Sequence, residues 1–199
     1  MFFKYNSKIF FLSSLFGKLI NTLLFKNNLN GICAGYNEAL YKTNDAGITW
    51  QSATWGITLN GRDINKLFAG QYGVMYAAGG LDSIDGFLLK SVDGANTWEI
   101  ISEWTEHEIN TAYSPKHNYI VVAGSAGFVQ LTSDGGESWQ DCDIPEFDFP
   151  LEITSIDFID ENNGICAGGQ RGIDSVSIIL KTNNGGESWQ LAYNEISTC

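Results

Sequence analysis

The chain has 199 residues, with 23 acidic against 11 basic side chains and a formal net charge of −12. Nucleic acids and anionic membranes recruit clustered Lys and Arg, so this charge balance argues against both as partners and favours a basic or neutral partner. Gly is abundant at 22 residues, Pro is scarce at 3, and the length fits a single domain.

Residues 1–19 come first and have two interpretations. Lys4 and Lys8 precede the apolar run Ile9–Phe16, which is the charge order of a secretory signal, although the usual small-residue cleavage site is missing. A signal would place the protein outside the cytoplasm, in the periplasm, at the cell surface or secreted. The alternative is an outer β-strand that closes the ring of sheets expected for the rest of the chain. Eight apolar residues are too few to span a membrane, so no transmembrane anchor is expected.

Residues 20–199 are predicted to form one domain of four repeats. Each repeat opens with an Ile that is followed four or five positions later by an aromatic residue. These isoleucines are Ile20, Ile64, Ile109 and Ile153, which are 44, 45 and 44 residues apart. A period of roughly 40 to 45 residues is typical of a four-stranded propeller blade. The repeats run over about 20–63, 64–108, 109–152 and 153–199.

Each repeat is predicted to hold four strands. Short segments rich in β-branched and aromatic residues alternate with Gly, Asn and Asp, the usual pattern of strands and turns. The first strand starts at the Ile. The second strands are expected at 32–34, 74–77, 120–123 and 165–167, and the third at 40–43, 87–91, 128–132 and 178–182. The fourth strand begins at a Trp. The fold class is therefore an all-β propeller of four four-stranded blades, either complete or an incomplete arc of a larger propeller. An incomplete arc would expose two apolar blade faces and favour self-association.

A motif of the form Thr-x-Asp-x-Gly-x-Thr-Trp joins the third strand to the fourth. A carboxylate or amide in such a turn accepts backbone N–H groups, Gly supplies the positive φ, and the Trp covers the core. We interpret these box residues as structural. They are Thr43, Asp45, Gly47, Thr49 and Trp50; Ser91, Asp93, Thr97 and Trp98; Thr132, Asp134, Gly136, Ser138 and Trp139; and Thr182, Asn184, Gly186, Ser188 and Trp189. Two boxes depart from the pattern, with Ala95 in place of Gly and Asn184 in place of Asp.

These boxes resemble the Asp-box (BNR) repeat of sialidases, sortilin-type receptors and several secreted glycosidases. The segments 158–168 and 179–189 look more like the repeat of the photosystem II assembly factor family, the Ycf48-like propellers. The resemblance covers the chain from Ile20 to about Ala192. It implies a propeller that binds proteins or acts as an assembly scaffold. The photosynthetic members are similar in presenting an arginine-rich patch, whereas this sequence holds only Arg62 and Arg171.

Strand parity places the loops between second and third strands on the same rim as the connections from repeat to repeat, opposite the boxes. Long loops are expected there at 80–86 and 169–177, and acidic and aromatic residues alternate in the connections. This rim either docks a basic protein segment, with Trp104, Phe147 and Phe149 as anchors, or consists of solvated loops whose aromatics fold back onto the blades. The candidate partner-binding residues are Trp55, Arg62, Asp82, Asp85, Trp104, His107, Phe147, Phe149 and Arg171.

No catalytic residue, metal or cofactor is predicted. Sialidases on this repeat hold the substrate carboxylate with three arginines, which this chain cannot supply, and no carboxylate pair is distinguished as that of a glycosidase. Cys33 and Cys166 are expected to be buried in different blades, Cys142 and Cys199 lie in connecting or terminal segments, and no cysteine spacing suggests zinc.

The main functional prediction is a non-catalytic protein-binding or assembly-scaffold propeller that uses the variable rim. The alternative is a secreted carbohydrate-binding or glycoside hydrolase-like (non-sialidase) propeller module that uses the rim tryptophans.

Overall fold

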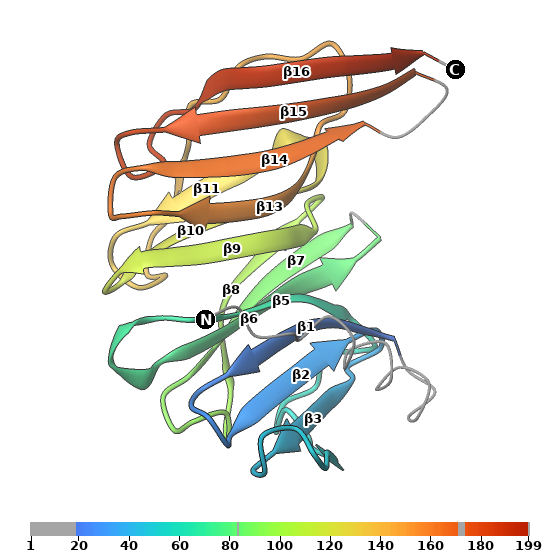
Figure 1. Cartoon of the computed structure of the whole chain (residues 1–199), viewed down its shortest axis with the longest axis vertical. Coiled ribbons are helices and arrows are strands. Elements are labelled where there is room, and N and C mark those ends of the chain that lie inside the picture. The colour runs from blue at the N-terminus through green and yellow to red at the C-terminus, as the bar shows by residue number, and fades with distance from the viewer. Residues whose placement is uncertain (1–18, 83, 171–173, 199) are drawn as a thin grey trace.

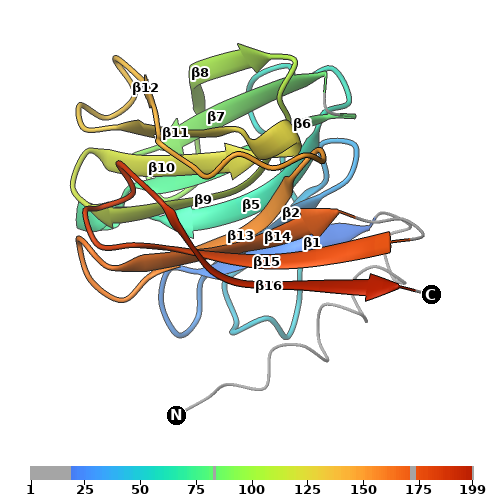
Figure 2. The same cartoon turned by 90° about the horizontal axis from the view of Figure 1, so that it is seen from above.

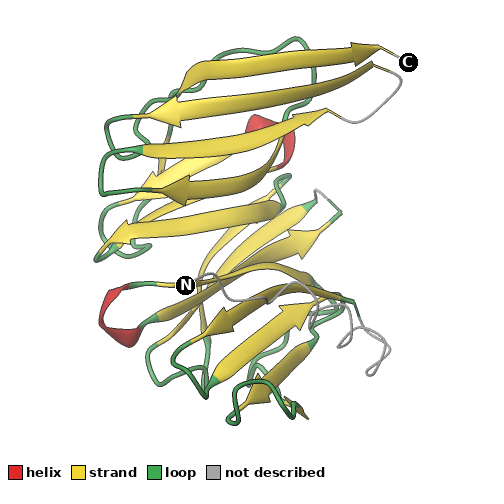
Figure 3. Ribbon diagram, viewed as in Figure 1, coloured by secondary structure: helices red, strands yellow, loops and turns green. Residues whose placement is uncertain are grey.

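A computed structural model describes residues 19–82, 84–170 and 174–198. Both interpretations of residues 1–19, and the predictions for Arg171 and Cys199, concern positions outside the described residues, apart from Leu19. In the described chain the strands form four four-stranded antiparallel sheets, and each strand pairs with the next one in sequence. Two short 3-10 segments, η1 (Gln71–Gly73) and η2 (Ser125–Gly127), interrupt this pattern (Figure 3). The prediction of an all-β propeller with four four-stranded blades is confirmed.

Each sheet is one blade, and its strands follow the repeats (Figure 1). Blade 1 contains β1 (Ile20–Phe25), β2 (Gly31–Gly35), β3 (Leu40–Thr43) and β4 (Gln51–Ser52). Blade 2 contains β5 (Asp63–Ala69), β6 (Met75–Leu81), β7 (Asp85–Ser91) and β8 (Glu99–Thr105). Blade 3 contains β9 (Ile109–Lys116), β10 (Tyr119–Gly124), β11 (Val129–Thr132) and β12 (Gln140–Asp141). Blade 4 contains β13 (Glu152–Phe158), β14 (Gly164–Gln170), β15 (Asp174–Thr182) and β16 (Gln190–Thr198). Every first strand begins within one residue of its predicted Ile, and every fourth strand begins one residue after its Trp.

The blades are stacked along the longest axis of the molecule, with blade 1 and blade 4 at opposite ends (Figure 1). The first strands contact one another in series, from β1 to β5, from β5 to β9 and from β9 to β13. Seen from above, the sheets lie one behind the other (Figure 2). The four described blades therefore form an open arc.

Alternation along the strands gives each blade two faces, which we call the leading face, toward the preceding blade, and the trailing face, toward the next one. On the trailing face of blade 1, Ile32 and Leu40 are buried in one core with Leu67 and Phe87 of blade 2. Equivalent cores join blade 2 to blade 3 and blade 3 to blade 4. The stack is thus held by a separate apolar core between each pair of neighbours, as repeat architectures require.

The two long loops expected at 80–86 and 169–177 are wrong, because the flanking strands continue as paired hairpins. Leu81 pairs with Asp85, and Gln170 pairs with Val176. The glycines there are strand residues at a close backbone approach. A Cβ added at Gly80 would lie 2.0 Å from the Asp85 carbonyl oxygen, and one added at Gly169 would lie 1.8 Å from that of Val176.

Candidate partner-binding site

The four box turns share one network of hydrogen bonds. In every box, the hydroxyl of the first Thr or Ser accepts the backbone N–H four residues later at 3.0 Å, as Thr43 does from Gly47. The same hydroxyl donates to the Asp or Asn side-chain oxygen at 2.6–2.9 Å. That oxygen also accepts the N–H of the second Thr or Ser at 2.9–3.1 Å. The polar groups of each turn are therefore used within the turn.

The Asp boxes differ from the Asn box in the direction of one hydrogen bond. The second hydroxyl donates to the carboxylate in the three Asp boxes at 2.5–2.7 Å, whereas the Asn184 amide donates to Ser188 Oγ at 2.9 Å. Hydrogen bonds from Thr49 lower the pKa of Asp45 to about 2. Similar bonds, chiefly from Thr97 and Ser138, hold the pKa values of Asp93 and Asp134 well below the usual range. Carboxylates this acidic stay ionised at neutral pH and do not act as general acids.

Two consecutive residues with positive φ reverse the chain in each box. In the second box these are Gly94 at φ 77° and Ala95 at φ 70°. Ala95 stands where the pattern has Gly, and its N–H still donates to Ser91 Oγ at 3.0 Å. The turn therefore forms as expected, although a side chain at positive φ is strained.

The box tryptophans pack over the blades. Trp98 and Trp189 are buried, and Trp50 and Trp139 are half-buried. Trp50 Nε1 donates to the Gly47 carbonyl at 3.2 Å, and Trp139 Nε1 donates to Ser102 Oγ at 2.6 Å. Within the described residues, the buried indole nitrogens of Trp98 and Trp189 have no partner. Two of the four box indoles thus donate a hydrogen bond.

Opposite the boxes lies the variable rim, which in the described chain consists of the connections 53–62, 106–108 and 142–151, the turns at 36–39 and 125–128, Asp82, and the strand ends that carry Asp85 and Trp104. Strand parity places these segments on one side, as expected. The rim residues nevertheless differ greatly in accessibility.

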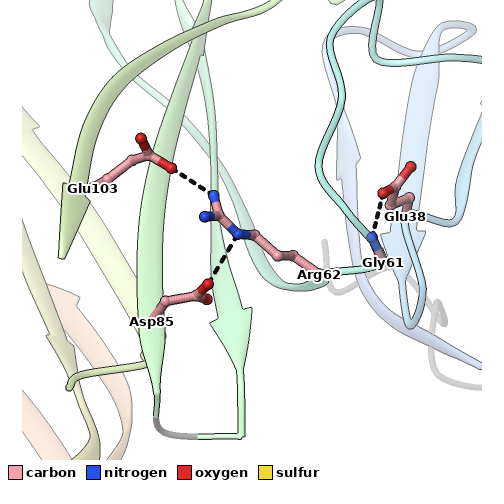
Figure 4. Close-up of polar contacts among 5 residues, drawn as sticks. All are labelled: Glu38, Gly61, Arg62, Asp85 and Glu103. Carbon is pink, nitrogen blue, oxygen red and sulfur yellow. Dashed lines mark hydrogen bonds and ion pairs between the residues drawn. The ribbon is translucent and has the colours of Figure 1, made fainter. Parts of the chain in front are cut away.

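Arg62 is held by two carboxylates (Figure 4). Its Nε lies 3.1 Å from Asp85 Oδ2, and its Nη1 lies 2.7 Å from Glu103 Oε1. The guanidinium carbon also lies 5.5 Å from the centre of the Phe87 ring, and only 17% of the side chain is exposed. Arg62 therefore fastens the connection between blades 1 and 2 to blade 2, with its charge already paired.

Trp55 was expected on the accessible rim, and this is wrong. Its indole is buried, stands edge-on to Trp98 at 5.1 Å between ring centres, and donates to the Glu38 carbonyl at 3.0 Å. The connection after β4 folds inward because this large ring completes the core between blades 1 and 2. Asp82, in the tight β6–β7 turn, is exposed.

Trp104 and His107 pack against blade 3. Trp104 stands edge-on to Trp139, with 5.0 Å between ring centres, and its Nε1 donates to Gln130 Oε1 at 2.8 Å. The His107 ring stacks on Phe128 at 4.4 Å. These two rim residues thus agree better with aromatics that fold back onto the blades than with free anchors.

Phe147 and Phe149 lie together in a groove of about 400 Å³ on blade 4. Their ring centres are 5.3 Å apart, both rings are half-buried, and the alternating Glu146 and Asp148 are exposed. The lining residues are Glu146, Phe147, Asp148 and Phe149 of the connection, Val176 and Ile178 of β15, and Leu191 and Asn194 of β16. The structure therefore brings two of the three predicted anchors together, whereas Trp104 is not among the lining residues.

A second pocket, of about 380 Å³, lies between the box turns of blades 1 and 2 and was not foreseen. Lys26 and Lys42 line it together with amide side chains that include Asn30, Gln51 and Asn96. Lys42 Nζ donates to the Ala95 carbonyl, and burial lowers the pKa of Lys42. Nothing in the sequence around either lysine indicates a binding site. The two lysines meet residues of blade 2 only because blades 1 and 2 stack. The lining has groups that could bind a small anion or a sugar.

The thiols of the described chain lie in environments that favour the protonated form. Cys33 and Cys166 are buried in different blades, as expected, and Cys142 is half-buried; all three are free. Burial raises the pKa of each to about 12, so little thiolate forms at neutral pH. Across the described ranges, no group of His, Cys, Asp and Glu is arranged to hold a metal ion. None of the helical segments in that part of the chain has the length and apolarity to cross a membrane.

The chain is a β-propeller-type protein, because its four-stranded sheets stack as blades. One rim consists of box turns whose polar groups are hydrogen-bonded within each turn, and the segments of the opposite rim differ from repeat to repeat. No protein-family model matches the chain. It is 28% identical over 159 residues to the photosystem II assembly lipoprotein Ycf48 of Synechococcus sp., an alignment covering 76% of this chain and 42% of that protein. The chain thus spans less than half of the curated relative that it matches.

Solved structures share the fold at lower identity. Ycf48 bound to a D1 peptide superposes with a TM-score of 0.56 at 15% identity, covering 88% of this chain and 82% of the other. Ycf48 from Cyanidioschyzon merolae gives 0.63 at 18% identity, covering 87% and 56%. An ancestral GH74 enzyme gives 0.61 at 19% identity, covering 86% and 23%. The chain therefore has a Ycf48-like propeller fold, which assembly factors and glycoside hydrolases share, so the fold does not decide the activity.

Proposed function

We propose that this protein is a non-catalytic propeller module that binds a protein partner on its variable rim and serves as an assembly scaffold. The observation that carries the proposal is the groove on blade 4, where Phe147 and Phe149 lie beside the exposed carboxylates of Glu146 and Asp148. We also propose that the box turns are Asp-box elements with a purely structural role, because their polar groups bond within each turn.

The groove favours a peptide with both basic and apolar side chains. Its floor is apolar, with Val176, Ile178 and Leu191, and half-buried aromatic rings commonly anchor protein interfaces. The carboxylates at its edge, in a chain of net charge −12, would attract a basic segment and speed its association. Lys or Arg flanking a Leu or Phe would complement both features.

The relatives support a protein partner. The curated relative is described as an assembly lipoprotein, and one solved relative is bound to a D1 peptide. We extend peptide binding to this chain as a proposal, since the chain covers only 42% of the curated relative. An extracytoplasmic location would agree with the signal interpretation of residues 1–19, and it stays a prediction.

The carboxylates of the box turns and those paired with Arg62 do not favour catalysis. The box aspartates are ionised and bonded within their turns, and Asp85 and Glu103 are both engaged by Arg62. The rival proposal is a sugar-binding module. The burial of Trp55 removes one of its stacking platforms, but the amide-rich pocket beside Lys26 and Lys42 gives it a specific alternative site.

Titration calorimetry with two peptides tests the proposal: a D1 peptide, and a synthetic peptide with leucines between lysines. We expect at least one to bind, and Phe149→Ala to weaken that binding by about tenfold or more, as the loss of an aromatic anchor does. Tyr72→Ala is the matched control, because Tyr72 is an exposed aromatic residue near the box turns. Peptide binding that Phe149→Ala leaves unchanged would contradict the proposal. Glycan binding that is lost on Asn96→Ala would favour the rival.

A further inference from the structure

The trailing face of blade 4 is apolar and exposed. Ile165 on β14, Ile179 on β15 and Tyr193 on β16 are 55%, 37% and 49% exposed, respectively. The strand register places Ile179 directly between Ala167 and Tyr193 in one cross-strand row, with Ile165 in the adjacent row. These side chains therefore form one continuous patch on a sheet face.

The same positions are buried in the other three blades. The pentapeptide Gly-Ile-Cys-Ala-Gly forms β2 and also begins β14, yet Ile32 of the first copy is 4% exposed whereas Ile165 of the second is 55% exposed. In each blade the first box Thr or Ser pairs with a residue of the second strand, and equivalent positions are counted from that pair. In blades 1–3, the residues equivalent to Ile165 and Ile179 are all 5% exposed or less. They are Ile32, Tyr76 and Val121, and Leu40, Leu88 and Val129. The trailing face of blade 4 therefore carries the apolar residues that are buried in the other blades, but here they are exposed.

The opposite end of the stack differs. On the leading face of blade 1, Cys33, Tyr41 and Ile20 are buried. A head-to-tail contact would require an accessible leading face on blade 1 as well as the trailing face of blade 4, and would continue into a ring or filament. The burial on blade 1 argues against a head-to-tail contact between blade faces and favours an interface in which the blade 4 face meets itself.

We propose that the trailing face of blade 4 docks on the same face of a second copy, forming a two-fold symmetric dimer. The patch has charges of both signs in its rows: Lys181 pairs across the sheet with Ile165, Asp157 lies on the other side of Ile165, and Glu195 pairs with Ser177. A two-fold axis through the patch can place Lys181 of each copy against a carboxylate of the other. This self-complementarity favours a second copy as the occupant, and the inference does not depend on the partner groove.

The area of the trailing face of blade 4 limits how tightly two copies can bind. Four strands spaced about 4.8 Å apart, over about six residues of about 3.3 Å, give a face on the order of 400 Å² per copy. Two copies would therefore bury about 800 Å² in total, which is below the roughly 1,200–2,000 Å² of stable specific interfaces and in the range of weak, transient ones. The net charge of −12 on each copy also opposes association, and salt screens that repulsion. We therefore expect a weak dimer that dissociates on dilution and strengthens with added salt.

Light scattering and sedimentation of the full chain, in reducing buffer over a wide concentration range, test the proposal. The mass should rise from 21.9 kDa toward twice that value. Ile165→Glu and Ile179→Glu should each remain monomeric at the highest concentration. Ile159→Glu is the control with the same charge change, since Ile159 lies in the β13–β14 turn of the same blade and is 89% exposed. It should dimerise as the unaltered chain does.

Far-UV circular dichroism and thermal unfolding of every variant establish that each is folded. Folded Ile165→Glu that dimerises like the unaltered chain would overturn the proposal. So would an unaltered chain that stays monomeric throughout, or one whose mass grows beyond the dimer, because an isologous interface closes at two copies.

Discussion

The two rims of this propeller are built on opposite principles. On the box-turn rim, the hydroxyls, the carboxylate or amide, and the backbone of each of four similar turns form hydrogen bonds with one another. The residues that recur are therefore the ones that shape the turn. On the variable rim, every segment has different surroundings: Trp55 enters a core, Arg62 is clamped, and Phe147 and Phe149 line a groove. The contrast teaches that repetition here marks structure, and that a binding surface is to be sought where the repeats diverge.

The largest expected effect is loss of a box tryptophan. Trp98→Ala removes a buried ring between blades 1 and 2 and should lower the free energy of unfolding by about 3–5 kcal/mol, as large-to-small core changes do. Phe149→Ala, on the variable rim, should cost only about 1 kcal/mol because its ring is half-buried. Urea unfolding measures both. If both variants lost the same free energy of unfolding, the distinction between a structural box-turn rim and a binding variable rim would be contradicted.

Removing the Arg62 clamp should have the next largest effect. Arg62→Ala leaves the partly covered Asp85 carboxylate without its cation, whereas Glu103 is 52% exposed and stays solvated, so we expect a loss of about 1 kcal/mol in the free energy of unfolding. Arg62→Lys should lose less, because it keeps the charge and gives up the two-pronged geometry. If neither variant changes the urea midpoint, the clamp is not structural and Arg62 is free to serve a partner.

Acid should weaken the box turns of blades 1–3. The pKa of Asp45 is lowered from 3.8 to about 2 in the folded chain, and those of Asp93 and Asp134 are lowered further. A lowered folded pKa gives stability that is present above the unfolded value, near 4, and is lost as the pH falls through the folded value. Stability should therefore decline from about pH 4 downward.

The box of blade 4 provides the matched comparison, because Asn184 does not titrate. Asp45→Asn, Asp93→Asn and Asp134→Asn together make every box resemble that of blade 4. The combined variant should show a shallower dependence of the urea midpoint on pH below pH 4. An unchanged dependence would place acid sensitivity outside the boxes.

The smallest expected effect is the reverse change, Asn184→Asp. The new carboxylate would accept the Ser188 hydroxyl, as Asp134 accepts Ser138, and we expect a gain below about 1 kcal/mol at pH 7. The gain should disappear near pH 2. Urea unfolding at the two pH values measures it, and destabilisation at pH 7 would show that the amide is required in this blade.

The sequence predicted features that are local. The isoleucine starts of the strands, the box turns and the burial of Cys33 and Cys166 follow from spacing and turn chemistry within one repeat. Trp55, the Arg62 clamp and the pocket of Lys26 and Lys42 depend on how one blade meets the next, which no single repeat encodes. Gly80 and Gly169 were misread as loop residues because the sequence does not distinguish a turn glycine from one at a close strand approach.

The most direct test of the account is hydrogen–deuterium exchange of the chain with and without the peptide that binds it most tightly in the calorimetric comparison. We expect slower exchange in peptic fragments that cover residues 144–151 and 190–195, which border the groove, and no change over the box turns at 43–50 and 132–139. Slower exchange confined to the box turns, with none at the groove, would contradict the assignment of binding to the variable rim and of structure to the boxes.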